Sequence, residues 1–259
     1  MKLTFLGTGT SFGVPQIGCH CAVCRSTDPR DKRTRVGAVV ETGTGTRLLI
    51  DTPPELRTQL ISAGIDRVDA VLFTHEHADH TNGIDDVRAI SVRRAAALDF
   101  SGPAEALERI AKRFDYIFDD AIQPLPGTSK PQGRLRPVDA GSTVVIGDAT
   151  VRAIAVPHGP GIVFGYRIGG LGYVTDASSL PGDVLDAFRG VRVLVLNALF
   201  RTEHPMHLSL PEALRCAAAV GAERTYLTHL THENLHADLE AELPRGIAPA
   251  FDGLTVRID

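Results

Sequence analysis

Short apolar runs alternate with amphipathic segments along the first half of the chain. Apolar or alternating patterns predict β-strands over residues 3–6, 36–42, 47–51 and 70–73. Helical spacing of apolar side chains predicts helices over residues 54–64, 85–97 and 103–113. Residues 123–137 are rich in Pro, Gly, Lys and Arg and are predicted to form a loop.

The second half of the chain repeats this rhythm. Strands are predicted over residues 143–146, 150–156, 161–168, 171–175, 191–196 and 224–228, and a helix over residues 210–220. Strands that alternate with helices are typical of the α/β class. Because both halves carry polar residues at their strand ends, we expect a four-layer αββα sandwich with a site between the halves. We treat residues 1–259 as a single domain.

One predicted strand leads directly into an H-x-H-x-D-H run at residues 75–80. The end of that strand can direct His75 and His77 toward one point. The start of the following helix can bring Asp79 and His80 to a neighbouring point. Imidazole and carboxylate ligands suit Zn²⁺, Mn²⁺ or Fe²⁺ better than Mg²⁺ or Ca²⁺. The alternative interpretation is an exposed polar loop that is rich in histidine.

Three further residues of ligand type follow other predicted strands, namely His158, Asp176 and His229. The α/β folds place their sites at the carboxyl ends of strands. Taken singly, each residue has an ordinary alternative as a surface histidine or a capping residue. Together with the H-x-H-x-D-H run they resemble, in order and spacing over essentially the whole chain, the ligand pattern of the metallo-β-lactamase superfamily. The resemblance implies the αββα metallo-β-lactamase fold and a dinuclear metal-dependent hydrolase.

The resemblance also implies how the ligands are shared. One metal would be held by His75, His77 and His158, the second by Asp79, His80 and His229, and both by the bridging carboxylate of Asp176. Two metals roughly 3.5–4 Å apart can lower the pKa of a bridging water and clamp a phosphoryl or acyl oxygen. Mn²⁺ and Zn²⁺ both suit such ligands. Asp51 resembles the family's aspartate that orients a ligating histidine, although it can also be a turn or capping residue.

Three of the four cysteines, Cys19, Cys21 and Cys24, lie within six residues of one another. In a cytosolic chain such clustering favours a thiolate metal site over disulfide bridges, and a redox dithiol is the alternative. The fourth, Cys216, is predicted to be a small buried side chain in an apolar helix.

The stretch from Gly7 to Cys24 resembles the N-terminal signature of the PhnP-type cyclic phosphodiesterases. In that group the C-x-C-x₂-C cluster and a late histidine, three residues after the catalytic one, bind a structural zinc. That spacing assigns the role to His232. A set of three thiolates and one imidazole suits tetrahedral Zn²⁺. His20 is a competing ligand, but its position between two cysteines makes the geometry unfavourable.

His207 resembles an active-site histidine that the same group places before its penultimate helix. There it would contact phosphate or act as a general acid toward the leaving alkoxide, while Asp79 acts at the metals. The alternative is a histidine at a helix start, because Ser209 and Pro211 signal a helix N-terminus. Asn197 stands where an acidic residue is expected after its strand.

Composition limits the partners. The formal net charge of −4 argues against nucleic acid as a partner, although it allows a local pocket for one phosphate. The first residues do not form a signal peptide, and no apolar run is long enough to cross a bilayer. We expect a cytoplasmic protein that contacts no membrane and binds a small phosphodiester, with a homodimer allowed.

The sequence therefore predicts a hydrolase that opens a small cyclic phosphate or nucleotide-like diester by attack of a metal-bridging hydroxide. Two divalent metals (Mn²⁺ or Zn²⁺) and one structural Zn²⁺ are its expected cofactors. Alternatives are a tRNA 3′-processing endonuclease, a thiolesterase or lactonase, and a non-enzymatic metal-binding accessory protein.

Overall fold

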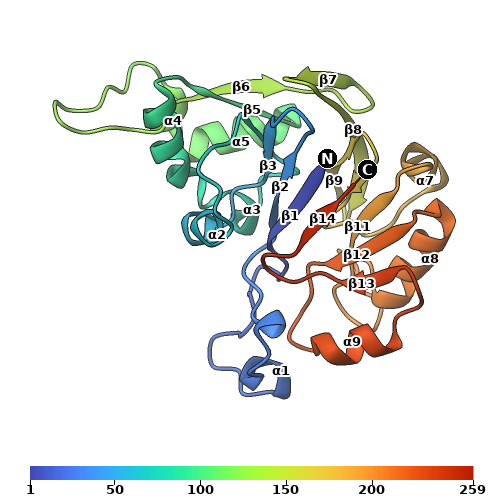
Figure 1. Cartoon of the computed structure of the whole chain (residues 1–259). Helices are drawn as coiled ribbons and strands as arrows, with labels where there is room; N and C mark the ends of the chain where they lie inside the picture. Colours follow the sequence, from blue (N-terminus) through green and yellow to red (C-terminus); the bar gives the residue numbers. More distant parts are fainter. Residues whose placement is uncertain (259) are drawn as a thin grey trace.

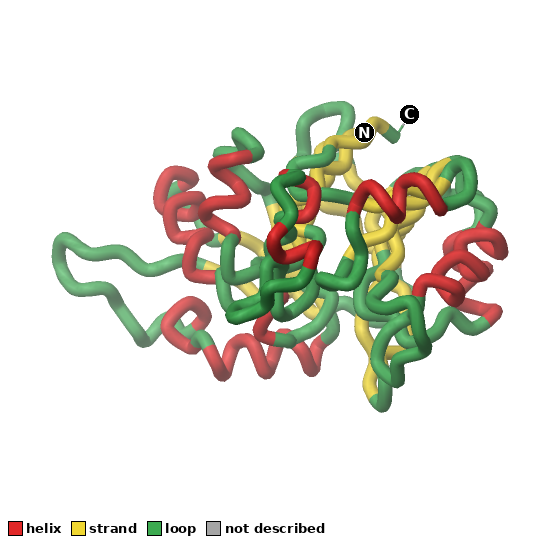
Figure 2. Tube along the Cα trace, turned by 90° about the horizontal axis from the view of Figure 1, so that it is seen from below, coloured by secondary structure: helices red, strands yellow, loops and turns green. Residues whose placement is uncertain are grey.

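The computed structural model describes residues 1–258 as two mixed β-sheets packed face to face, with helices on both outer faces (Figures 1 and 2). The predicted α/β class and αββα sandwich are confirmed. The first sheet has the order β14 (Thr255–Arg257), β1 (Lys2–Gly7), β2 (Gly37–Glu41), β3 (Arg47–Ile50), β4 (Ala70–Leu72), β5 (Leu98–Gly102) and β6 (Gly133–Pro137). The second has the order β13 (Ile247–Pro249), β12 (Arg224–Thr228), β11 (Val193–Asn197), β10 (Leu171–Tyr173), β9 (Gly161–Ile168), β8 (Ala149–His158) and β7 (Thr143–Ile146).

Helices from each half cover the sheet of the same half (Figure 1). The first sheet is flanked by α2 (Leu56–Ser62), α3 (Ala78–Thr81), the 3₁₀ turn η2 (Ile84–Val87), α4 (Arg88–Arg94), α5 (Ala104–Arg113) and α6 (Asp115–Phe118). The second is flanked by α7 (Gly182–Phe188), α8 (Leu210–Val220) and α9 (His236–Glu242). A separate N-terminal lobe contains α1 (Ala22–Arg25) and the 3₁₀ turn η1 (Pro29–Asp31). None of the helices in residues 1–258 is long and apolar enough to span a membrane.

Apolar side chains fill the space between the sheets and the space under each helical layer. Phe5, Tyr166 and Tyr173 lie between the two sheets, Phe100 under the first helical layer and Phe188 under the second. Burial of this surface is the main term that stabilises the sandwich.

The parallel part of each sheet positions the polar strand ends. Strands β3 and β4 run parallel in the first sheet, and β10, β11 and β12 run parallel in the second. Parallel neighbours end at the same edge, so the segments that follow β4, β10 and β12 can meet between the halves.

Two predictions about elements were wrong in part. The helix predicted over residues 85–97 is instead η2 followed by α4, which ends where Ala95 adopts a left-handed conformation with φ of 50°. The loop predicted over residues 123–137 ends in a strand, because β6 pairs in parallel with β5. The side chains of Arg134 and Arg136 on β6 pair with Asp99, so this edge strand carries no apolar signal in the sequence.

Asp252, in the turn before β14, ties the N-terminal strand to its neighbours. Its carboxylate accepts hydrogen bonds from the Thr8 hydroxyl at 2.8 Å, and from the Thr34 amide at 2.7 Å and hydroxyl at 2.6 Å. Burial raises the pKa of Asp252 to about 6, against these hydrogen bonds that favour its charged form.

We therefore expect Asp252 to give the protein a pH-dependent stability. A raised folded-state pKa means that the native state binds the proton more tightly, so stability falls as the pH rises from about 4 to about 6 and is level above that. The wild type should lose about 3 kcal/mol relative to Asp252→Asn across this window. Urea unfolding of both proteins at several pH values measures the difference. A difference that does not change with pH would contradict this assignment.

Candidate metal centre

Strand ends from both sheets bring the predicted ligands together. The ligand atoms within each of these groups lie within 4.8 Å of one another: His75, His77 and His158; His75, His80 and Asp176; Asp79, His80 and His229; and His158, Asp176 and His207. The groups share members, so they form one continuous cluster. Its residues follow β4, end β8, follow β10 and β12, or lie in α3 and the loop before α8.

Asp51, directly after β3, holds two of the histidines in one orientation. Its Oδ2 lies 2.8 Å from Nδ1 of His80 and accepts a hydrogen bond from the Thr74 hydroxyl, also at 2.8 Å. Because the Thr74 proton goes to Asp51, its oxygen is free to accept from Nδ1 of His75 at 2.9 Å. Both rings therefore carry a proton on Nδ1 and direct Nε2 toward the centre.

His158 is oriented in the same way by a backbone group. Its Nδ1 lies 2.8 Å from the carbonyl oxygen of Met206, which can only accept a hydrogen bond. The proton is thus on Nδ1, and Nε2 is left as a ligand atom.

The unpaired atoms of the cluster fit a cation. The Nε2 atoms of His75, His80 and His229 are buried and form no hydrogen bond within residues 1–258. Carboxylate oxygens of Asp176 nevertheless lie 3.2 Å from Nε2 of both His80 and His229. Buried nitrogen and carboxylate atoms that face one another without a hydrogen bond are costly alone and well suited to sharing a divalent cation.

The ionisation of the cluster residues also indicates a cation site. Burial disfavours the ionised carboxyl of Asp176, yet His229 and His80 hold the pKa of Asp176 well below its usual range. Burial also disfavours charge on His80, yet Asp176, Asp79 and Asp51 raise the pKa of His80 well above its usual value. The site therefore favours positive charge at its centre.

Backbone strain is concentrated at these strand ends. Asp51, Asp176 and His229 have φ values of 61°, 62° and 57°, in the left-handed region that non-glycine residues rarely adopt. Such residues persist where the surrounding structure holds them, and they are common at functional sites.

Helix α5 supports the histidine run from outside. The Thr81 hydroxyl donates to the carbonyl oxygen of His77 at 2.9 Å. Arg113 donates in turn to the Thr81 oxygen at 3.1 Å and to the Glu76 carbonyl at 3.0 Å. The exposed His77 is thereby fixed through its backbone. Sequence reasoning did not identify Arg113, because only the packing of α5 brings it to this loop.

His207 faces the cluster. Its Nδ1 is buried, forms no hydrogen bond within the described residues and lies 3.6 Å from Oδ1 of Asp176. Its ring stacks on that of His229 with centroids 4.8 Å apart. Burial lowers the pKa of His207 to about 3, so its ring is neutral near pH 7 and can donate a hydrogen bond through one nitrogen.

Asn197, at the end of β11, fixes the segment that carries Asp176. Its Oδ1 accepts from the Ala177 amide at 2.8 Å, and its Nδ2 donates to the Ala177 carbonyl at 3.0 Å. An acidic side chain at this position could make only the first bond. The amide thus supplies a donor and an acceptor to the residue next to Asp176, rather than a charge.

Replacing Asn197 by aspartate should therefore destabilise the protein. The Ala177 carbonyl would lose its donor, and a carboxylate would be buried, so we expect the free energy of unfolding to fall by about 1–3 kcal/mol. Urea denaturation measures this loss, and metal analysis of the same variant should show weaker retention at the cluster. An unchanged urea midpoint would show that the two bonds to Ala177 are dispensable.

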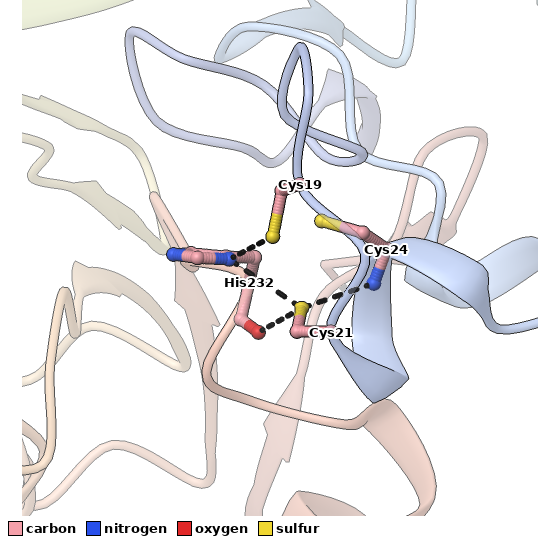
Figure 3. Close-up of side chains that lie close together, drawn as sticks. All are labelled: Cys19, Cys21, Cys24 and His232. Atoms are coloured by element: carbon pink, nitrogen blue, oxygen red, sulfur yellow. Dashed lines mark hydrogen bonds between the residues drawn. The ribbon is translucent and has the colours of Figure 1, made fainter.

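The N-terminal lobe holds a second cluster. The ligand atoms of Cys19, Cys21, Cys24 and His232 lie within 4.8 Å of one another (Figure 3). Nδ1 of His232 lies 3.2 Å from Sγ of Cys19 and 3.5 Å from Sγ of Cys21. The Cys24 amide, which donates to the sulfur, lowers the pKa of Cys21 to about 6, so this thiol ionises readily. Three sulfurs and one imidazole nitrogen fit Zn²⁺, whereas His20 is exposed and belongs to neither cluster.

Comparison with known families agrees with this geometry. Residues 46–230 match the model of the β-lactamase superfamily domain. The chain belongs to the β-lactamase superfamily. It is thus a hydrolase of the metallo-β-lactamase fold, and the predicted resemblance to this family is confirmed.

Several individual proteins are similar to this chain over all or nearly all of its length. One similar solved structure is the crystal structure of a new diphosphatase from the PhnP family. Its sequence is 36% identical to this chain and its fold superposes with a TM-score of 0.91, over 100% of this chain and 98% of that chain. The octanoyltransferase of Porphyromonas gingivalis is 39% identical over 100% of this chain but only 52% of its own length, so our chain spans about half of that relative. Ribonuclease Z of a Bradyrhizobium strain is 26% identical, over 98% of this chain and 99% of its own.

Proposed function

We propose that this protein is a dinuclear metal-dependent phosphodiesterase that hydrolyses a small cyclic phosphate or nucleotide-like diester. The observation that carries the proposal is the convergence of seven ligand side chains on one centre, with the nitrogens of several histidines left free to bind a cation. The 36% identity to a diphosphatase of the PhnP family supports a phosphate compound as the substrate.

The proposed centre divides its ligands between two metals, Mn²⁺ or Zn²⁺. One would be held by His75, His77 and His158, the other by Asp79, His80 and His229, and both by Asp176. When bound, two divalent cations supply Lewis acidity to a phosphoryl group and make a neighbouring water more acidic. A further Zn²⁺ would be held by Cys19, Cys21, Cys24 and His232 in a structural role.

Two side chains would act on the reacting atoms directly. Asp79 stays ionised because His80 and His229 outweigh the effect of burial on its pKa, so its carboxylate can accept a hydrogen bond from the attacking water and orient it. His207 lies beside Asp176 and would donate a hydrogen bond to the leaving oxygen, with its pKa rising once an anionic substrate is bound.

A substrate panel tests the proposal. The metal-loaded protein is assayed with cyclic ribose phosphates, 2′,3′-cyclic nucleotides, aryl phosphodiesters, precursor tRNA, octanoyl thioesters and homoserine lactones. We expect turnover of small phosphodiesters, loss of that turnover in His77→Ala, and unchanged turnover in His20→Ala, whose histidine is exposed and outside both clusters. Hydrolysis of thioesters or tRNA without turnover of small phosphodiesters would overturn the proposal.

His207→Ala tests the role of that side chain. We expect kcat to fall by about a hundredfold or more for a substrate with an alkoxide leaving group, but only a few-fold for p-nitrophenolate, which needs no proton. The metal content should stay that of the wild type. If His207→Ala instead loses a metal, the residue is a ligand and not a donor to the substrate.

A further inference from the structure

Arg33, between η1 and β2, is a fully buried cation. Its side chain and that of Asp31 are 0% and 1% exposed, and Nη2 of Arg33 lies 3.2 Å from Oδ1 of Asp31. An ion pair buried this deeply is often no more stabilising than apolar side chains of the same volume. The ion pair alone therefore does not explain why a cation is buried here, and the other hydrogen bonds of the Arg33 side chain indicate its role.

The backbone of Arg33 pairs with that of Val14, whereas its other side-chain hydrogen bonds all go to one segment, residues 229–236, which follows β12. Nη1 of Arg33 donates to the carbonyl oxygen of Thr231 at 2.9 Å, and Nη2 donates to that of Asn234 at 2.8 Å. Asp31 contacts the same segment, because its Oδ1 accepts a hydrogen bond from the amide of His236 at 2.8 Å. The planar guanidinium spans two carbonyls, which a lysine ammonium on a flexible stem does not reproduce.

The same segment supplies one ligand to each metal cluster. His229 belongs to the cluster between the sheets and His232 to the cysteine cluster, and Thr231 lies between them. His229 is held in a left-handed conformation with φ of 57°, which needs external support. Arg33 donates to the Thr231 carbonyl, which lies in the stretch that joins the two ligands. In the same stretch, the amide of Leu230 donates to the carbonyl oxygen of Thr8 at 2.9 Å.

We propose that Arg33 is a positioning residue that couples the two metal clusters through the Thr231 carbonyl. Metal in the cysteine cluster fixes His232, and the buried guanidinium transmits that constraint to His229. The proposal rests on the metal clusters of the proposed function but not on the substrate. Coupling of this kind is reciprocal, so each cluster should strengthen metal binding at the other.

A double-mutant cycle tests the coupling. Chelator competition measures the affinity of the histidine cluster for Zn²⁺, with no substrate present. Four proteins are compared: the wild type, Cys21→Ser, Arg33→Lys and the double variant. We expect Cys21→Ser to weaken this affinity about tenfold in the wild-type background, within the usual range of coupling. In the Arg33→Lys background, the same change should alter the affinity less than about twofold. Because the readout is metal binding, failure here is separate from failure to hydrolyse phosphodiesters.

Arg30→Lys is the matched control, because Arg30 is partly exposed and pairs with Asp28 and Glu240 outside the 229–236 segment. It should leave the affinities at both clusters unchanged. An equal effect of Cys21→Ser in both backgrounds, or no effect in either, would overturn the proposal.

A measurement on the wild type keeps the proposal testable if Arg33→Lys does not fold. Co²⁺ titration reports the cysteine cluster by its thiolate charge-transfer absorption. Filling that cluster should raise the affinity of the histidine cluster at least about fivefold. Independent binding at the two clusters would also overturn the proposal.

Discussion

Replacing Asp176 by asparagine is expected to lower phosphodiester hydrolysis by at least about a thousandfold, the effect of losing several kcal/mol of charge stabilisation by the metals. The carboxylate of Asp176 lies 3.2 Å from Nε2 of both His80 and His229, so it is the side chain best placed to bind both of the proposed metals. An amide has the same shape and tolerates the left-handed backbone, but it carries no negative charge. The variant should therefore remain folded and lose metal.

Two measurements follow this variant, kcat/KM for an aryl phosphodiester and the metal content by elemental analysis. Asp183→Asn is the matched control, because Asp183 is an exposed residue in the first turn of α7. Circular dichroism should show the same fold for all three proteins. Retention of activity within tenfold of the wild type would show that Asp176 is not shared by two catalytic metals.

The second large effect concerns stability. Cys21→Ser should lose one zinc per chain and lower the thermal midpoint by about 10 °C, since each kcal/mol lost moves the midpoint by about 2–4 °C in a chain of this size. The reason is the small apolar core of the N-terminal lobe, where Val14 and Val23 pack mainly against the cysteines and Leu235. A lobe with so few apolar contacts would depend on the proposed zinc for much of its folding energy.

Scanning calorimetry and zinc analysis measure the loss, with Cys216→Ser as the control. Cys216 lies in α8, outside the cluster, and should keep the full zinc content. Burial raises the pKa of Cys24 to about 11, so zinc uptake at pH 7 should also release the proton of this thiol. A Cys21→Ser variant with unchanged zinc content would contradict a zinc site at the cluster.

Much of the site could be predicted because its ligands follow apolar strands. Polar residues after apolar runs, such as His158 and His229, are weak signals singly, and only their order and spacing along the chain resemble the family's ligand pattern. Parallel pairing brings His229 to the edge between the halves, whereas His158 ends β8, which pairs antiparallel with both neighbours. Helix α8 was predicted at the bounds that the structure shows, because Ser209 and Pro211 signal its N-terminus. The structure adds a capping box between Ser209 and Glu212.

The supporting residues could not be predicted, because their roles depend on contacts between distant segments. In the sequence, Arg33 is one of several charged residues in a polar loop. Only the folded chain shows that its side chain is buried and bonded to Thr231 and Asn234, which lie about 200 positions later in the sequence. Asn197 reads as a missing acid until its two bonds to Ala177 are seen. Strand β6 carries arginines outward on a sheet edge, so its sequence resembles that of a loop.

Residues of both halves are proposed to form one dinuclear metal centre, and anomalous diffraction would locate its metals without relying on activity. Crystals of the metal-loaded protein would be measured above and below the Mn and Zn absorption edges. We expect two peaks about 3.5–4 Å apart among His75, His158, Asp176 and His229, and one zinc peak among the three cysteines and His232. A single zinc peak at the cysteines, with none between the sheets, would rule out a dinuclear centre formed by the two halves.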